Sequence, residues 1–420
     1  MARLAVLGGS RTKTKSFPKW PQYDRREEDA LQQVLRSRRW ARNQGTQTAE
    51  FEKAFAEFQD AKYAVAISSG TQALEVTLGA LGIGPGDEVI VPDYSFFATA
   101  SAVLSVGALP IFVDITDTSY CIEPDQIEPA ISDRTKAVIA VHVGGHPADL
   151  DRLYEISHKN GLVILEDCAH AHGSEWRGKK VGTFGSAGAF SFQSSKLITA
   201  GEGGIILTNN KRIEQRARSI HDCGRLPGGG TYDHYNYGSN CRLTEWQGAI
   251  LRVQLTRFKD HRELRMQNAK RLSEMLSKID GITPLSQDER CTYNSYFAFI
   301  FRYDCSSFLG LSGAGFREAM QAEGIPIWPS YPPLNQLHIF QKKKFLERLH
   351  IAKDEIPNKM ITILRSHYPV TEKASREAVW LPHHTLLGDE QDLSEIVEAV
   401  KKIQDNAREL VDGNRRAAAD

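Results

Sequence analysis

The sequence predicts an α/β fold, in which a large domain with a mostly parallel sheet precedes a smaller α+β domain. Two observations predict it. Between residues 61 and 209, short apolar runs rich in β-branched residues alternate with helical segments, which is typical of a parallel sheet covered by helices on both faces. From residue 244 on, this alternation gives way to a long helical pattern and then to mixed short strands and helices. A chain of 420 residues is long enough for both units.

The first part of the chain contains an arm, a helix and the sheet. Residues 1–30 are polar and interrupted by proline and tryptophan, so we expect an arm and no domain there, while 28–37 has a helical pattern. Helices are also expected at 71–82 and 98–107. Strands are expected at 61–70, 88–93, 109–115, 136–145, 162–170, 186–193 and 203–209. We place the large domain at 31–255.

The second part begins with residues 244–279, which show apolar residues at helical spacing and no strand pattern. This predicts a pair of long helices that links to another unit. A strand at 295–304 and helices at 316–324 and 393–404 then predict the smaller domain, which spans 256–410 together with the linking helices.

Composition excludes several classes of protein. Lys plus Arg and Asp plus Glu both number 52, so the formal net charge is zero and no basic surface for nucleic acid is expected. The sequence contains no run of 18 apolar residues, which argues against a membrane span. The six cysteines are scattered and form no CxxC pair, a pattern that favours a cytoplasmic protein over a disulfide framework or a zinc site.

The first motif with chemical meaning is SSGTQAL, residues 68–74. A strand ends here, Gly70 permits a sharp turn, and a helix starts at Thr71. The free N–H groups at a helix N-terminus bind anions, and the hydroxyls of Ser69 and Thr71 add donors, so the motif fits a phosphate site. An ordinary N-cap explains the same residues, because Ser and Thr favour that position.

Two further segments carry an acid and a lysine. In LVILEDCAHAHG, residues 162–173, Asp167 stands at the end of an apolar strand, where a buried carboxylate needs a cationic partner; a surface acid is the alternative. In AGAFSFQSSKLITAGEGG, residues 187–204, Lys196 has apolar neighbours and a glycine-rich stretch after it. A lysine removed from water loses its proton more readily and attacks carbonyls, although a surface lysine is again the alternative.

Together these segments fit one ligand that carries a phosphate, a ring nitrogen that can be protonated, and an aldehyde. Pyridoxal 5'-phosphate (PLP) has all three groups. Each segment alone is weak evidence, whereas their order and spacing are specific.

The chain resembles the DegT/DnrJ/EryC1/StrS family of sugar aminotransferases over roughly residues 20–400. The resemblance is carried by SSGTQAL, GPGDEVIVPDYSFFATASAV, PIFVDI, TKAVIAVHVGGHPADLD, LEDCAHAHGS, GAFSFQSSK, TAGEGG and GSNCRLTEWQGAIL. It implies the PLP-dependent transferase fold type I, which is the fold of aspartate aminotransferase. It also implies a homodimer whose active sites lie at the interface.

The resemblance implies a role for individual residues. Lys196 matches the lysine that holds PLP as a Schiff base, and Asp167 matches the acid that pairs with the pyridine nitrogen. The other implied PLP contacts are Ser69, Gly70, Thr71 and Ser191 at the phosphate, Phe96 stacked on the ring, His170 near the ring hydroxyl, and Asn240 at the phosphate of the partner subunit. Tyr331 resembles part of the family's loop that reaches toward substrate, and a packed loop aromatic is the alternative.

Two departures from many family members are His170, where Gln is common, and Gln193, where His is common. Titration of His170 could alter the pH profile. His170, His172 and the segment HDCGR at 221–225 are similar to glutamine-dependent scyllo-inosose aminotransferases and to 3-amino-5-hydroxybenzoate synthases.

We therefore expect an aminotransferase that moves nitrogen from Gln or Glu to a keto-sugar or keto-cyclitol in aminosugar or aminocyclitol antibiotic biosynthesis. An aromatising PLP dehydratase, a non-catalytic PLP-fold regulator and a Schiff-base aldolase without PLP are the alternatives. The regulator would usually carry an added DNA-binding domain, for which residues 1–30 are too short, and the aldolase would not explain the phosphate loop.

The remaining polar residues receive structural interpretations. No metal site is expected, because the adjacent His383 and His384 would point to opposite faces of a strand. Arg225 and Arg242 could bind a substrate carboxylate, but pairing with nearby acids is favoured for each.

Overall fold

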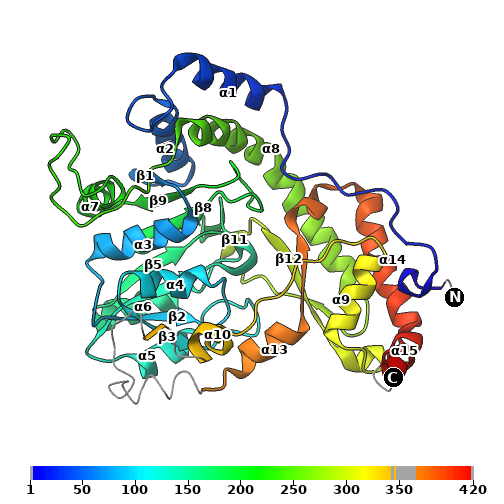
Figure 1. Cartoon of the computed structure of the whole chain (residues 1–420). Helices are drawn as coiled ribbons and strands as arrows, with labels where there is room; N and C mark the ends of the chain where they lie inside the picture. The colour runs from blue at the N-terminus through cyan, green and yellow to red at the C-terminus, as the bar shows by residue number, and fades with distance from the viewer. Residues whose placement is uncertain (1–2, 342–344, 347–365, 418–420) are drawn as a thin grey trace.

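The computed structural model describes residues 3–341, 345–346 and 366–417. Its largest element is a seven-stranded sheet in the order β1-β9-β8-β5-β4-β2-β3 (Figure 1). Among these seven strands β9 alone runs in the opposite direction to the rest, so the predicted, mostly parallel sheet is confirmed. The strands are β1 (Tyr63–Ile67), β2 (Glu88–Pro92), β3 (Leu109–Val113), β4 (Thr135–Val141), β5 (Val163–Asp167), β8 (Ala187–Ser191) and β9 (Gly204–Thr208).

Helices follow most of these strands, as expected for parallel crossovers. The best defined start is that of α3, where the Ser69 hydroxyl accepts a hydrogen bond from the Gln72 N–H at 3.2 Å. The helix packs against β8 and β9 of the sheet. The helices of this part are α3 (Gly70–Leu81), α4 (Ala98–Ser105), α5 (Ile127–Ala130), α6 (Leu150–Asn160) and α7 (Lys211–His221), with the 3-10 turns η2 (Pro124–Gln126) and η3 (Val143–Gly145).

One long helix, α8 (Glu245–Leu276), replaces the predicted helix pair, so that prediction is wrong. Its 32 residues extend for about 48 Å. They contain no proline, and Gly248 in the first turn is the one glycine, so nothing in the sequence breaks the helix. Figure 1 shows α8 passing from the large sheet toward α14. The sequence analysis also missed α2 (Gln47–Phe58), which packs beside α8, as does α1 (Arg25–Ser37).

A second, antiparallel sheet has the order β10-β12-β13. Its strands are β10 (Ile282–Pro284), β12 (Ala298–Tyr303) and β13 (Ala378–Pro382). The helices near it are α9 (Gly313–Ala322), α13 (Pro369–Glu377), α14 (Glu390–Asp405) and α15 (Ala407–Ala417), with η1 (Ala5–Leu7), η4 (Cys305–Phe308) and η6 (His383–Leu387). By contrast, η5 (Leu334–Gln336) and α10 (His338–Gln341) pack on the large domain, where the Phe340 ring of α10 meets Phe112 of β3. A small sheet joins β6 (Glu175–Trp176), β7 (Lys179–Lys180) and β11 (Cys291–Tyr293).

The second sheet lies between two hydrophobic cores. Along β12, Ala298 and Ile300 join the core of the large sheet, while Phe299 and Phe301 face a second core formed with α9, α14 and the end of α8. This alternation is what a strand buried on both faces requires. The N-terminal arm adds Leu4 and Phe17 to the second core.

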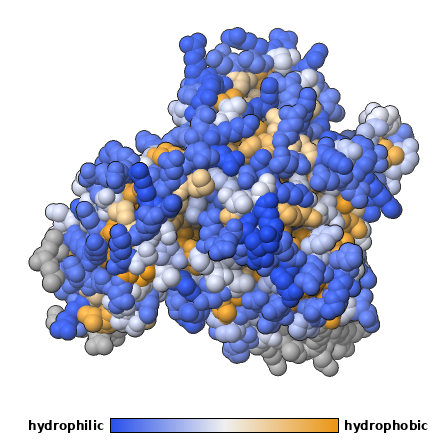
Figure 2. Space-filling model, turned by 180° about the vertical axis from the view of Figure 1, so that it is seen from behind, coloured by the Kyte–Doolittle hydropathy of each residue, from blue (hydrophilic) through white to orange (hydrophobic). Residues whose placement is uncertain are grey.

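The surface seen from behind is largely hydrophilic, with hydrophobic residues in small scattered groups (Figure 2). Within the described residues, no helix combines the length and the apolar character that crossing a membrane demands.

Candidate active site

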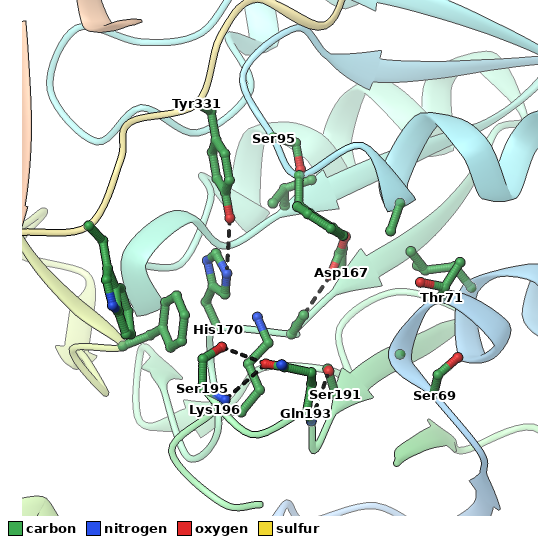
Figure 3. A pocket seen from close by; sticks show the side chains of 18 of the residues that line it. Ser69, Thr71, Ser95, Asp167, His170, Ser191, Gln193, Ser195, Lys196 and Tyr331 are labelled. Carbon is green, nitrogen blue, oxygen red and sulfur yellow. Dashed lines mark hydrogen bonds between the residues drawn. The ribbon is translucent and has the colours of Figure 1, made fainter. Parts of the chain in front are cut away.

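A cavity of about 400 Å³ opens where the parallel strands of the large sheet end. β1, β2, β5 and β8 all run in the same direction, so the residues that follow their carboxyl ends gather at one edge, where α/β sheets bind ligands. Nearly all of the predicted site residues line this cavity: Ser69, Gly70, Thr71, Phe96, Asp167, His170, Ser191, Lys196 and Tyr331 (Figure 3). The exception is Asn240.

Lys196 extends into the cavity from the irregular segment after β8. Its ammonium group lies 4.4 Å from the centre of the Phe297 ring. Removal from bulk water lowers the pKa of this amine to about 8, while the nearby Asp167 carboxylate opposes the shift. The amine is therefore closer to its neutral, nucleophilic form at pH 7 than an exposed lysine is.

Asp167 is the last residue of β5 and is buried. The Thr99 hydroxyl donates to its Oδ2 at 2.9 Å, and the Ala169 N–H donates to its Oδ1 at 3.2 Å. Burial raises the pKa of Asp167, and the Thr99 hydrogen bond opposes that shift. Among the described residues no Lys, Arg or His forms an ion pair with this carboxylate, so a cationic group in the cavity would find it available.

The preceding strand residue, Glu166, has a different role. It points away from the cavity, because successive side chains of a strand alternate. Its carboxylate accepts hydrogen bonds from the N–H groups of Gly182, Phe184 and Gly185 at 2.7–2.8 Å. Glu166 thus holds the loop before β8, a role for which the sequence analysis gave no prediction.

The N-terminus of α3 faces the cavity beside Ser191 (Figure 3). The first N–H groups of the helix, those of Gly70 and Thr71, have no acceptor within the helix itself. A Cβ at position 70 would lie 2.6 Å from the Ser191 Cβ, so only glycine lets this serine approach the helix so closely. The two predicted interpretations of this motif coexist, since Ser69 caps the helix while the neighbouring N–H groups stay free for an anion.

The opposite wall of the cavity is aromatic. It is formed by Phe297, Trp328, Tyr331 and Trp380, of which the sequence analysis singled out Tyr331 alone. His170 stacks on Phe297 with the ring centres 3.9 Å apart, and its Nε2 lies 3.3 Å from the Tyr331 hydroxyl. Burial lowers the pKa of His170 well below its usual value, so its titration is expected below the neutral range.

Three other polar residues lie elsewhere. Asn240 is exposed and does not line the cavity of its own chain. Arg225 and Arg242 both pair with Asp222, as favoured from the sequence.

The sequence analysis argued against a metal site at His383 and His384 by placing both residues on a strand, and that placement was wrong. Both residues belong to the 3-10 helix η6 and not to a strand. Among the described residues, one group has ligand atoms close enough for a metal: His142, Glu166 and Cys168. Two of its members are already hydrogen-bonded, because the Ala148 N–H donates to His142 Nδ1, and His142 Nε2 therefore donates to Glu166 at 3.3 Å.

The residues of the cavity fit PLP. The N–H groups that begin α3 suit a phosphate, Asp167, which has no ion-pair partner within the described structure, suits a protonated ring nitrogen, and Lys196 suits an aldehyde. Gly70 also leaves open the space between the start of α3 and Ser191, which the side chain of a larger residue would fill.

The fold is that of the PLP-dependent aminotransferases. The chain belongs to the DegT/DnrJ/EryC1/StrS aminotransferase family, whose model matches residues 21–401.

Two curated relatives and one solved structure illustrate this membership. The L-glutamine:2-deoxy-scyllo-inosose aminotransferase of Streptoalloteichus tenebrarius is 37% identical, covering 97% of this chain and 99% of that protein. The 3-amino-5-hydroxybenzoate synthase of Amycolatopsis mediterranei is 34% identical, covering 92% of this chain and 97% of that one. A crystal structure of a 3-amino-5-hydroxybenzoic acid synthase superposes with a TM-score of 0.85 at 34% identity, covering 93% and 99% of the two chains.

Proposed function

We propose that this protein transfers an amino group from L-glutamine or L-glutamate to a keto-cyclitol, with PLP bound through Lys196. The observation that carries the proposal is the cavity itself, in which Lys196, with a lowered pKa, and the buried Asp167, which has no ion-pair partner among the described residues, lie beside the N-terminus of α3. The name of the 37% identical relative supports glutamine as donor and a scyllo-inosose as acceptor.

Each residue has a defined part in this proposal. Lys196 would hold the cofactor through its aldehyde, and the Lys196 amine would move the proton at the donor's α-carbon. Asp167 holds the ring nitrogen protonated, and Ser69, Gly70, Thr71 and Ser191 hold the phosphate. The bound cofactor supplies an electron sink for the carbanion that proton removal leaves. The aromatic wall offers flat apolar faces to an uncharged ring such as a cyclitol.

The test is a half-reaction screen. The protein loaded with PLP is mixed with L-glutamine or L-glutamate, and conversion to the amine form of the cofactor is followed by absorbance. Keto-cyclitols and keto-sugars are then added in turn. We expect glutamine to convert the cofactor and a scyllo-inosose to restore it. Failure of every amino donor to convert the cofactor would contradict the proposal.

A second candidate is an aromatising dehydratase, favoured by the superposition on a 3-amino-5-hydroxybenzoic acid synthase. The two functions give different products from their substrates. An aromatic acid that absorbs in the near ultraviolet would establish the dehydratase, whereas a saturated amino-cyclitol detected by mass spectrometry would establish the aminotransferase.

We also propose that the protein is a cytoplasmic homodimer, in which Asn240 reaches the cofactor phosphate of the partner subunit. The exposed position of Asn240 outside its own cavity supports this, and six free cysteines suit a reducing compartment.

If sites are shared, Lys196→Ala and Asn240→Ala chains should complement when mixed. One site of a mixed dimer then carries both changes and the other carries neither, so random exchange restores at most roughly a quarter of wild-type activity. Confirmed exchange that yields only the average of the two variants would exclude the shared site.

A further inference from the structure

Three side chains from separate parts of the chain hold the backbone that carries Lys196. The segment from Ser191 to Lys196 leaves β8, and the last backbone hydrogen bond toward β9 is donated by the Phe192 N–H to the Gly203 carbonyl at 2.8 Å. His172 Nε2 lies 2.9 Å from the Ser191 carbonyl oxygen. Two further carbonyls of the segment receive donors in the same manner.

The first of these is the carbonyl of Ser194, which accepts from the Trp20 indole N–H at 3.1 Å. The second is the carbonyl of Ser195, which lies 3.1 Å from His383 Nε2. Trp20 comes from the N-terminal arm and His383 from η6, and their rings meet edge to face at 4.4 Å. The two residues immediately before Lys196 are thus held from outside the large sheet.

The tautomer of both histidines follows from these contacts. A ring nitrogen that faces a carbonyl oxygen must carry the hydrogen, so Nε2 is the donor in each case. The buried Nδ1 atoms of His172 and His383 have no hydrogen-bond partner in the described structure, which suits a neutral ring. Burial lowers the pKa of His172 to about 3, and lowers the pKa of His383 well below its usual value.

Arg265 of α8 reinforces this state. Its side chain is fully buried, and within the described structure none of its guanidinium nitrogens has a hydrogen-bond partner. The guanidinium lies 5.7 Å from the Trp20 ring centre, and its charge adds to burial in lowering the pKa of both histidines. A fixed positive charge at this place disfavours a second proton on either imidazole.

We propose that Trp20, His172 and His383 are positioning residues that fix the Lys196 segment, so that its amine projects into the cavity at a set point. The assignment rests on the proposed function for its effect on turnover. The predicted effect on the backbone does not depend on that function, because the three hydrogen bonds form within the protein without a ligand.

The test compares Trp20→Phe with Trp40→Phe. Both changes keep a ring and remove an indole N–H that points at a backbone carbonyl, but the Trp40 N–H faces the Leu35 carbonyl at 3.5 Å, away from the Lys196 segment, and Trp40 is 47% exposed. In Trp20→Phe we expect hydrogen exchange of the Ser194–Lys196 amides to rise by roughly fivefold, the loss that one neutral hydrogen bond causes. We also expect kcat to fall by a similar factor with the KM of the donor unchanged. Trp40→Phe should change neither.

A second pair of variants covers the possibility that Trp20→Phe does not fold. His383→Gln retains an N–H donor for the Ser195 carbonyl, whereas His383→Leu removes it, and we expect exchange to rise in the leucine variant and to be restored by glutamine. Equal exchange in all four variants and in the wild type would overturn the proposal. Because exchange is measured on the full chain without substrate, a protein that fails to transaminate would sink the proposed function and leave this result intact.

Discussion

The two sides of the cavity are built in different ways. On one side, the polar residues lie at the carboxyl end of a strand of the large sheet or within a few residues of it, as Ser69 lies two residues after β1 and Asp167 ends β5. On the other side, the aromatic residues come from the second sheet and from the irregular segment that carries Trp328 and Tyr331. We infer that the first side performs the chemistry shared by the family and that the second side selects the acceptor.

The two sides also differ in what holds their residues in place. The strand ends are fixed by the ladder of a buried sheet, and their side chains are hydrogen-bonded to the backbone or to Thr99. The segment with Tyr331 is irregular. It is anchored by single hydrogen bonds from the Trp328 N–H to the Trp380 carbonyl, between Tyr94 and Ser330, and from the Leu334 and Asn335 N–H groups to Asp93. Changes on the first side should therefore reduce turnover with every acceptor, and changes on the second side should alter which acceptor is used.

The largest effect is expected at Lys196. Lys196→Ala removes the amine that binds the cofactor, so we expect complete loss of transamination with any acceptor and no covalent adduct after borohydride reduction. Peptide mapping of the reduced wild-type protein should find the cofactor on Lys196. Lys136→Ala, an exposed lysine outside the cavity, serves as the control and should behave as wild type. Cofactor fixed to a different lysine would contradict the assignment.

The next largest effect is expected at Asp167. Asp167→Asn cannot hold a proton on the ring nitrogen, and we expect a loss of roughly a thousandfold in kcat, or about 4 kcal/mol of transition-state stabilisation. The matched control is Glu166→Gln, one residue earlier on the same strand. It weakens the hydrogen bonds to three backbone N–H groups and should lower the melting temperature more than kcat. Near-normal turnover in Asp167→Asn would mean that Asp167 does not pair with the ring.

The same division explains what could be predicted from sequence. The strands of the large sheet were predictable because each is a continuous apolar run bounded by turn residues, and Ser69, Asp167 and Lys196 each lie within a local motif next to a strand end. The topology of a parallel sheet then brings these ends together. Each of these residues can therefore be placed in the site from the short motif in which it lies.

The other side has no such motif. Phe297, Trp328 and Trp380 meet only because the second sheet and its neighbouring segment pack against the first core, which no short sequence pattern records. Thr99 could have been suspected from YSFFAT, since it lies one turn after Ser95, whose hydroxyl it contacts at 2.8 Å. The prediction of two helices at 244–279 was wrong because this stretch contains no proline, and no glycine beyond the first turn, that would end a first helix.

A smaller effect is expected at Tyr331. Tyr331→Phe removes the hydroxyl that lies 3.3 Å from His170 but keeps the ring in the aromatic wall. We expect the KM of the acceptor to rise by roughly fivefold, the value of one hydrogen bond, with the donor half-reaction unchanged. Tyr154→Phe, at an exposed position on α6, is the control. A change of equal size in the donor half-reaction would place Tyr331 on the chemical side of the cavity.

The smallest effect concerns pH and Asp93, which lies just after β2 beneath the Tyr331 segment. Its Oδ1 accepts from the Asn335 N–H at 2.7 Å, while Oδ2 and the Asn335 Oδ1 are buried and have no partner in the described structure. Burial raises the pKa of Asp93 to about 8, with Asp114 and Glu372 adding to the shift. A protonated Asp93 would supply the donor that this contact lacks.

Because the pKa of Asp93 is higher in the folded than in the unfolded chain, the folded state binds its proton more tightly. The stability that the neutral acid contributes is complete below its ordinary value of 3.8, and it is lost progressively as pH rises through about 8. Asp93→Asn keeps a donor and has no proton to lose. We therefore expect the melting temperature of the wild type, relative to Asp93→Asn, to fall by about a few degrees between pH 6 and pH 9. The acceptor KM of the wild type should rise by roughly twofold over the same range, because the lost hydrogen bond loosens the segment with Tyr331. If the melting temperatures of the two proteins change equally between pH 6 and pH 9, Asp93 is already ionised in the fold. The segment with Tyr331 would then have no pH dependence of its own.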